Sequence, residues 1–169
     1  MNRSRSGVLI VSFAVAVTIF ASAQEGAGVL GPDAIKKVVP ATYFFRGQSA
    51  PVQLRNSAGF RSADGMFTLA GLVDTSGYAS DIQQKYQGFL ITEVKISIEG
   101  TSVAPGAYGF GFEKDGNFLI MDVGAHDLAS VPFHTDAKMT RAVPLKVEAD
   151  PGGGYRLYGG KKWVTLKAQ

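Results

Sequence analysis

The stretch AYGFGFEKDGNFLIMDV, residues 107–123, decides the fold, because it joins two apolar β patterns through a turn signal. Asp115 and Gly116 suit the two central positions of a type I′ turn, where both residues need a positive φ. If these two residues form the loop, Lys114 pairs with Asn117 and the register of the whole hairpin follows. The stretch therefore predicts an antiparallel β-hairpin.

This register predicts which side chains share a face of the hairpin. One face is a continuous apolar block of three cross-strand pairs: Tyr108 with Val123, Phe110 with Met121, and Phe112 with Leu119. The other face pairs Gly109 with Asp122 and Gly111 with Ile120. Because glycines leave a shallow floor beside a carboxylate, we expect a ligand-binding recess formed by Gly109, Gly111, Ile120 and Asp122.

Two alternatives to this recess remain open. Glycines at alternate strand positions also suit close packing by another sheet or by an aromatic ring. Asp122 lies on a partly apolar face, where a carboxylate needs hydrogen-bond donors or water. Instead of binding a ligand, it can accept hydrogen bonds from the backbone amides of the loop around His126.

Period-two patterns separated by Gly, Asn, Asp and Pro predict strands elsewhere in the chain. Besides the hairpin they cover residues 42–45, 51–55, 66–73, 89–99, 143–149, 155–158 and 161–167, with 89–99 the longest. Residues 80–86 predict one interior helix, with Ser80 as its N-cap and with Ile82 and Tyr86 facing the core. Residues 32–39 allow one or two helical turns between Pro32 and Pro40. The fold class is mainly β: an antiparallel β-sandwich or a small β-barrel with one short helix.

The N-terminus has the pattern of a secretory signal peptide. Arg3 and Arg5 precede an uncharged run at residues 8–20, and the small residues at 21–23 follow it. This run of 13 residues is shorter than the roughly 20 that cross a bilayer as a helix. We therefore expect a cleaved signal peptide at residues 1–23, a flexible leader at 24–31 and a single β-rich domain at 32–169, located in the periplasm or outside the cell.

Composition restricts the partners of this domain. The chain contains no cysteine, so it has neither disulfides nor thiolate metal sites, which together with the short signal peptide favours a bacterial exported protein. Without Arg3 and Arg5, 15 Lys and Arg residues face 14 Asp and Glu residues. Since the basic residues form no stripe, we expect no nucleic-acid partner. We also expect no transmembrane segment after cleavage of the signal peptide.

A second hairpin is predicted around Gly159 and Gly160, which suit a two-residue loop. Its pairing places Arg156 opposite Trp163, where a guanidinium over an indole contributes about 0.5 to 1 kcal/mol. Trp, Tyr and Arg often anchor protein interfaces. An exposed strip of Arg156, Tyr158, Lys161 and Trp163 is therefore a candidate surface for a protein partner.

Both histidines of the chain fall within nine residues, and an aspartate follows each of them. Imidazole and carboxylate groups bind divalent metals, so His126, Asp127, His134 and Asp136 form a candidate metal site. The alternative is that these residues lie in loops at 123–125 and 130–132, cap turns and face solvent. Acid–base or metal-dependent catalysis would require both imidazoles to converge with Asp122, Asp127 or Asp136 in a cleft.

No motif in the chain identifies a reaction, and the G-x-S-x-G elbow of serine hydrolases is absent. We therefore assign no catalytic residue and no cofactor. The sequence favours an exported, non-catalytic binding or scaffolding β-domain whose ligand is a small molecule or a protein. One alternative is an interaction module that uses the Arg156 and Trp163 hairpin. The other is an enzyme that uses His126 and His134.

Overall fold

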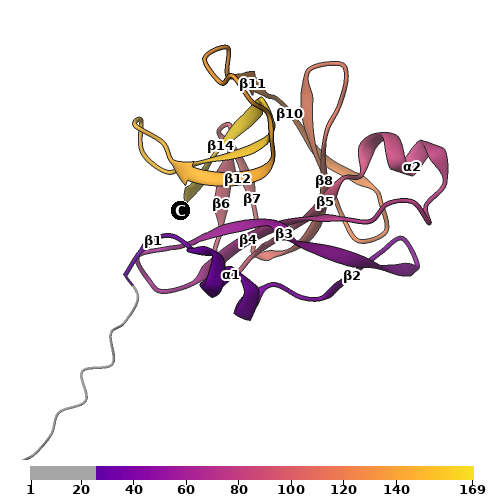
Figure 1. The fold of residues 1–169 in the computed structure, drawn as a ribbon, viewed down its shortest axis with the longest axis horizontal. Coiled ribbons are helices and arrows are strands. Elements are labelled where there is room, and N and C mark those ends of the chain that lie inside the picture. Colours follow the sequence, from indigo (N-terminus) through magenta and orange to yellow (C-terminus); the bar gives the residue numbers. More distant parts are fainter. Residues whose placement is uncertain (1–25) are drawn as a thin grey trace, which may run out of the picture.

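The computed structural model describes residues 26–169, so the predicted signal peptide lies outside the described part (Figure 1). Two antiparallel β-sheets and two short helices make up the fold, and no closed barrel is formed in this part of the chain. The predicted mainly β class is confirmed, with a sandwich rather than a barrel as its architecture.

The first sheet, here called the large sheet, has the strand order β1-β3-β4-β5-β8-β9-β10, and β2 pairs with β3 beside it. Its strands are β1 (Gly28–Val29), β2 (Thr42–Phe45), β3 (Gln48–Arg61), β4 (Phe67–Val73), β5 (Gly88–Thr92), β8 (Gly106–Phe112), β9 (Asn117–Met121) and β10 (Asp127–Pro132). The second, the small sheet, has the order β12-β13-β14-β6-β7, and β11 pairs with β14. Its strands are β6 (Ile96–Ile98), β7 (Thr101–Val103), β11 (His134–Thr135), β12 (Val143–Ala149), β13 (Tyr155–Gly160) and β14 (Lys162–Ala168).

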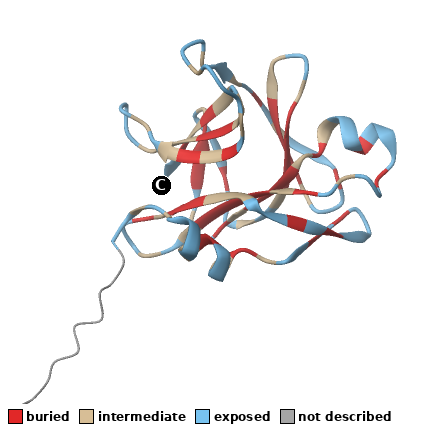
Figure 2. Cartoon of the chain, in the orientation of Figure 1, coloured by how far each residue is buried: buried red, intermediate tan, exposed pale blue. Residues whose placement is uncertain are grey.

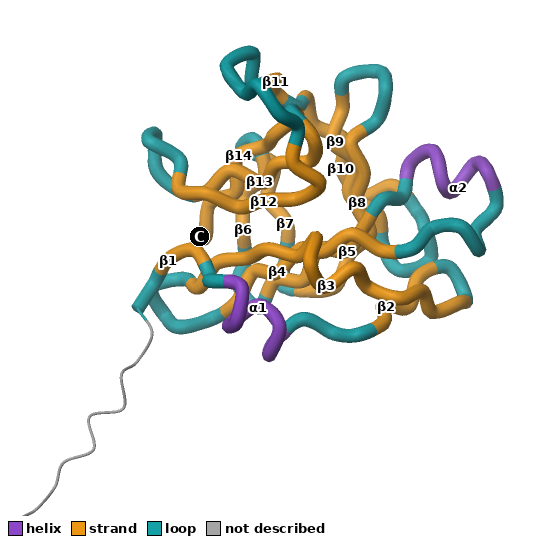
Figure 3. Tube along the Cα trace, in the orientation of Figure 1, coloured by secondary structure: helices purple, strands orange, loops and turns teal. Residues whose placement is uncertain are grey.

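The large sheet is buried on both faces, which makes the molecule three layers deep (Figure 2). Between the two sheets lies the sheet core, which includes Phe60, Leu90, Phe110, Phe118, Ile120, Ile96, Ile98, Leu157, Val164 and Leu166. On its other face lies the helix-side core, which includes Ile35, Tyr43, Phe45, Ile82, Tyr86, Phe89, Leu119 and Met121. The helices α1 (Pro32–Val38) and α2 (Ser80–Lys85) lie outside the strands in Figure 3 and each contributes one buried isoleucine to the helix-side core.

Residues 89–99 do not form one strand, as the alternation predicted, but two strands in different sheets. The chain leaves the large sheet after Thr92 and enters the small sheet at Ile96. At the bend, the Thr92 hydroxyl donates a hydrogen bond to the Val94 carbonyl at 2.7 Å. Leu90 and Ile96 still face the same core because the two sheets present their apolar sides to each other. The prediction of a single strand over residues 89–99 is therefore wrong.

The first hairpin forms where predicted, but its loop is longer by one residue. The amide of Glu113 donates to the carbonyl of Asn117 at 2.8 Å, so the loop contains residues 114–116. Gly116 has a φ of 104°, as the last residue of a three-residue loop requires. The Asp115 carboxylate accepts the amide hydrogen of Asn117 at 3.1 Å, and this hydrogen bond stabilises the turn within the loop.

A one-residue shift exchanges the faces of one strand relative to its partner. Phe110 therefore pairs with Ile120 rather than with Met121, and Gly109 pairs with Met121 rather than with Asp122. The predicted pairing of this hairpin is wrong. The aromatic side chains of β8 nevertheless face the sheet core as an apolar block.

The second hairpin has its loop at Gly160 and Lys161, one position after the predicted loop. Gly160 has a φ of 70° at the first central position, as a type II′ turn requires. Tyr158 pairs directly with Trp163, and Arg156 pairs with Thr165. Because the register differs by two residues, the faces stay as predicted, and the guanidinium carbon of Arg156 lies 4.0 Å from the Trp163 ring centroid. The predicted cation–π contact is confirmed.

The N-terminal leader and the helix cap also differ from prediction. Gly28 and Val29 pair with β3, so part of the predicted leader belongs to the large sheet. The N-cap of α2 is Ala79 instead of Ser80, and no side chain caps this helix. Ile82 is nevertheless buried, as is Tyr86, the residue that ends the helix.

Three further segments, in β7, β10 and β11, were not predicted as strands. Residues 130–132, expected as a loop, belong to β10, which pairs with β9. β7 and β11 are only three and two residues long, too short for an alternating pattern to reveal them. No helix among residues 26–169 is long and apolar enough to cross a membrane.

Candidate functional site

The glycines of β8 face a filled space instead of a recess. A Cβ atom placed on Gly109 would lie 2.4 Å from a ring atom of Phe45, and one on Gly111 would lie 1.9 Å from the carbonyl oxygen of Lys85. Ile120 faces the opposite side of the sheet, in the sheet core. The structure therefore does not bring together the four residues predicted to bind a ligand. Close packing, the alternative stated for these glycines, is what it shows.

Asp122 closes the loop between β9 and β10. Its Oδ1 accepts the amide hydrogens of Gly124 at 2.8 Å and His126 at 2.9 Å, and its Oδ2 lies 2.9 Å from Nδ1 of His126. The hydrogen bond from the His126 backbone lowers the pKa of the Asp122 carboxyl. The alternative in which the His126 loop supplies the donors for Asp122 is confirmed.

The two histidines lie at opposite ends of β10. His126 precedes this strand of six residues and His134 follows it. At about 3.3 Å per residue the strand separates them by roughly 20 Å. Asp127 pairs with Lys85 at 2.7 Å, and the Asp136 carboxylate accepts two backbone amides of the loop that follows it. Within residues 26–169 no three His, Asp or Glu side chains are placed to hold a metal ion. The convergence that an enzyme at these residues would require is not found.

Side chains of the predicted interaction strip contact other residues of the small sheet. Trp163 lies on β14 between two neighbouring strands: the Arg156 guanidinium contacts its ring from β13, and the His134 ring stacks on it from β11 at 4.3 Å. Tyr158 is 1 % exposed, so it is not available as a surface residue. Lys161 is exposed at the hairpin loop.

Glu99 is a polar residue of this region that the sequence did not single out. It occupies the loop between β6 and β7 with a φ of 47°, which a glutamate rarely adopts. Its carboxylate accepts the amide hydrogen of Thr165 and lies 3.2 Å from Nε2 of His134. These bonds fix His134 against Trp163. In the sequence, the pair Glu99-Gly100 between two short apolar runs indicates the turn in which Glu99 lies.

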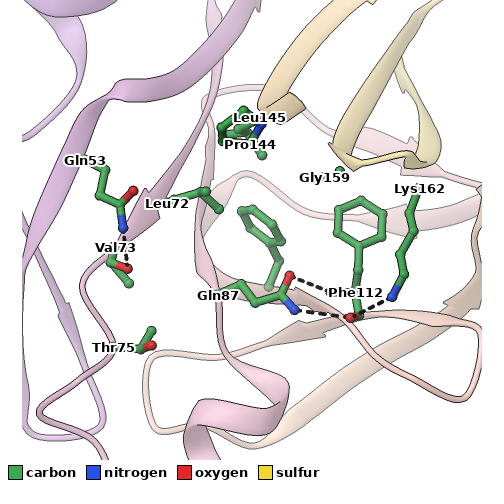
Figure 4. A pocket seen from close by; sticks show the side chains of 12 residues that line it. Gln53, Leu72, Val73, Thr75, Gln87, Phe112, Pro144, Leu145, Gly159 and Lys162 are labelled. Atoms are coloured by element: carbon green, nitrogen blue, oxygen red, sulfur yellow. Dashed lines mark hydrogen bonds between the residues drawn. The ribbon is translucent and has the colours of Figure 1, made fainter. Parts of the chain in front are cut away.

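A cleft lined by both sheets is the candidate site. Its volume is about 350 Å³, within the range of small-molecule sites. Its lining comes from both sheets and the segments between them: Gln53, Leu72, Val73, Thr75, Gln87, Phe110, Phe112, Pro144, Leu145, Gly159, Gly160 and Lys162. Figure 4 shows these side chains around an open centre.

The strand pairing shifts in register in two strands that border the cleft. The pairing of β3 with β4 shifts between Val52 and Ser57, and the pairing of β12 with β13 shifts between Val143 and Lys146. Such irregularities bend a strand and increase its twist, which favours separation of the two sheets at this edge. The Gln53 side chain donates to the Val73 carbonyl at 3.3 Å and fixes the bulge of β3 at the edge of the cleft.

The polar groups of the cleft gather around the end of β8. Gln87 accepts the amide hydrogen of Phe112 at 3.0 Å and donates to its carbonyl at 3.2 Å (Figure 4). The Lys162 ammonium donates to the carbonyls of Phe112 at 3.4 Å and Glu113 at 3.1 Å. No carboxylate of residues 26–169 forms an ion pair with Lys162. The cleft thus combines an apolar wall with one cation at its rim.

Little in the sequence indicates this cleft. Its lining residues come from six separate segments, and the pattern assigned Lys162 only to a strand. Chemically, the cleft can take up an apolar group beside Leu72 and offer amide and ammonium donors at one end. No protein-family model, curated protein or solved structure matches this chain.

Proposed function

We propose that this chain is an exported, non-catalytic binding domain whose ligand site is the cleft between the two sheets. Export is supported by the signal-peptide pattern at residues 1–23, and the mature chain would begin at Gln24. The lack of cysteine agrees with a domain that relies on its two apolar cores for stability. The ligand is a small, largely apolar molecule.

The composition of the cleft wall is the observation that supports this function. Leu72 is partly exposed in the cleft, while Leu145, Phe112 and Phe110 are buried behind it and close the cleft from the sheet core. Sites for small molecules typically combine such apolar walls with a few polar groups that orient the ligand. Gln53, Thr75, Gln87 and Lys162 are the polar side chains that line this cleft.

A thermal-shift screen of residues 24–169 against metals, lipids and glycans tests this proposal. A ligand that binds only the folded state raises the melting temperature as its concentration exceeds its Kd. We expect hits among apolar molecules. A Thr75→Trp variant, which fills the mouth of the cleft with an indole, should abolish the shift.

The matched control is Thr140→Trp, at an exposed position that does not line the cleft. It should retain the full shift. A flat response to every class of ligand contradicts a binding function, and hits that survive Thr75→Trp contradict the cleft as their site.

A further inference from the structure

We propose that the ligand is a single-chain amphiphile with an anionic head group, in the class of long-chain carboxylates. This inference rests on the proposed function of the cleft and names its ligand class. The head group binds at Lys162, and the hydrocarbon chain passes Leu145 into a second cavity along the same strands.

The second cavity continues the cleft along the boundary between β3 and β12. It has a volume of about 420 Å³, and its lining is Val29, Leu30, Pro32, Ile35, Lys36, Leu54, Arg55, Ser57, Ala58, Leu145, Lys146 and Val147. Leu145 lines both cavities. On β3, Gln53 lines the cleft and the residues that follow it line the second cavity. On β12, Pro144 likewise lines the cleft, and Lys146 and Val147 line the second cavity. The two cavities therefore succeed each other along one groove.

The surface of the second cavity suits a hydrocarbon chain. Val29 and Leu54 line it and are 46 % and 40 % exposed, respectively. Single exposed apolar residues are common, but two that line one cavity extend the apolar wall of the cleft outward. A ligand chain on this wall would remove their exposed apolar surface from water, which is favourable in proportion to the area covered.

Charge indicates the sign of the head group. The linings of the two cavities contain four basic residues, Lys36, Arg55, Lys146 and Lys162, and no carboxylate. This excess lies in a chain whose mature part is nearly neutral. Lys36 pairs with Asp33 at 3.2 Å, and Lys146 pairs with Glu148. Lys162 and Arg55 form no ion pair with any residue of the described part, so one cation without a counter-ion borders each cavity.

Lys162 is the better placed of these two cations to bind the head group. Two backbone carbonyls accept hydrogen bonds from its ammonium, which also lies 4.6 Å from the Phe133 ring centroid. These contacts hold the ammonium at the rim, and its third hydrogen remains for a ligand. Arg55, in contrast, is exposed. An ammonium–carboxylate hydrogen bond beside an apolar wall is stronger than a bond between neutral groups.

Isothermal titration of residues 24–169 with three molecules of equal chain length tests the head group. The probes are dodecanoate, dodecanol and dodecylammonium, with the two ions below their micellar concentrations and dodecanol below its solubility limit. We expect dodecanoate to bind at least tenfold more tightly than dodecanol, and dodecylammonium to bind more weakly than both. Lys162→Gln should reduce dodecanoate affinity about tenfold and leave dodecanol affinity unchanged. Lys162→Arg, which retains the charge, should restore most of the loss.

Lys161→Gln is the matched control, because it removes a neighbouring charge that lines neither cavity. It should leave all three affinities unchanged. Circular dichroism of each variant checks that it is folded. The course of the hydrocarbon chain is tested by Leu54→Glu, which should weaken hexadecanoate strongly and octanoate little.

The outcomes separate this inference from the proposed function. Equal affinity for all three head groups, abolished by Thr75→Trp, contradicts the anionic head group and leaves the cleft as a binding site. Loss of dodecanoate affinity in Arg55→Gln but not in Lys162→Gln contradicts the assigned orientation. If none of the three molecules binds while the thermal-shift screen gives cleft-dependent hits, the ligand class is wrong but the cleft function stands. A flat screen contradicts both.

Discussion

At the scale of single residues, the β-sandwich is held by contacts between near neighbours and by contacts between distant segments. Arg156 and Trp163 are in contact across one hairpin, and the donors of Asp122 lie within four residues of it. Glu99 and His134, in contrast, are 35 positions apart and meet only after both segments have joined the small sheet.

Asp150 is a residue at which local and distant contacts combine. Its carboxylate accepts hydrogen bonds from the Gly152 amide at 2.9 Å, the Arg156 guanidinium at 3.2 Å and the Thr165 hydroxyl at 3.4 Å. We expect Asp150→Asn to lower the free energy of unfolding by about 1.5 to 3 kcal/mol, the range for hydrogen bonds to charged groups. Urea denaturation measures this loss. Asp64→Asn, at an exposed turn residue, is the control and should change stability by less than about 0.5 kcal/mol.

Asp150 also makes the stability of the folded protein depend on pH. The hydrogen bond from Gly152, with Arg156 beside it, lowers the pKa of the Asp150 carboxyl in the folded protein. The unfolded chain therefore takes up the proton at a higher pH than the folded protein, and stability falls as pH drops below about 4. Melting temperatures from pH 2 to 7 should show a shallower acid loss in Asp150→Asn than in the wild type. Parallel curves would contradict this contribution of Asp150.

Variants of Trp163 test whether its ring stabilises the small sheet or belongs to an interaction surface. Because its ring lies between Arg156 and His134, we expect Trp163→Ala to lower the free energy of unfolding by about 1 to 3 kcal/mol. Trp163→Phe should recover part of this loss, since an aromatic ring remains for both partners. Calorimetry measures both variants. If Trp163→Ala instead retains full stability and loses capture of a protein partner in a pull-down, the interaction-module alternative is favoured.

At the scale of elements, alternation predicted which side of a strand is apolar but not which sheet the strand joins. The segment at 89–99 shows why: the period of two continues across the bend after Thr92, since both sheets bury the side that faces the other. In the hairpin at residues 107–123, the turn pair was recognised but the loop length was not. Asp115 and Gly116 are compatible with loops of two or three residues. The two loop lengths differ by one residue in register, so they pair opposite sets of side chains on each face of the hairpin.

A substitution in β8 tests whether the face with its glycines is closely packed. A methyl group on Gly111 would overlap the backbone carbonyl of Lys85, which cannot move without displacing the end of α2. We expect Gly111→Ala to lower the free energy of unfolding by about 3 kcal/mol. Gly77→Ala is the control, because nothing lies within 4 Å of its added methyl group. A stable Gly111→Ala protein would show that the glycine face is open and would support the recess predicted from the sequence.

At the scale of the whole molecule, the mainly β sandwich could be predicted and the cleft could not. Fold class depends on alternation and turn residues, which are local, and these occur throughout the chain. The cleft lies between two sheets, next to the register shifts of β3 and β12, which no local pattern indicates. Its residues converge only after both sheets have formed. This is why the sequence predicts only a strand at Lys162 and places its candidate recess on the face of β8 opposite the cleft.

The most direct test of the ligand site is a methyl and backbone NMR titration of isotope-labelled residues 24–169 with dodecanoate. The account predicts that the largest shifts fall on Leu72, Leu145 and Lys162, around the cleft, while Gly109 and Asp122 remain unchanged. Shifts centred on Gly109 and Asp122 would contradict it, and so would the absence of any localised shift at saturating ligand.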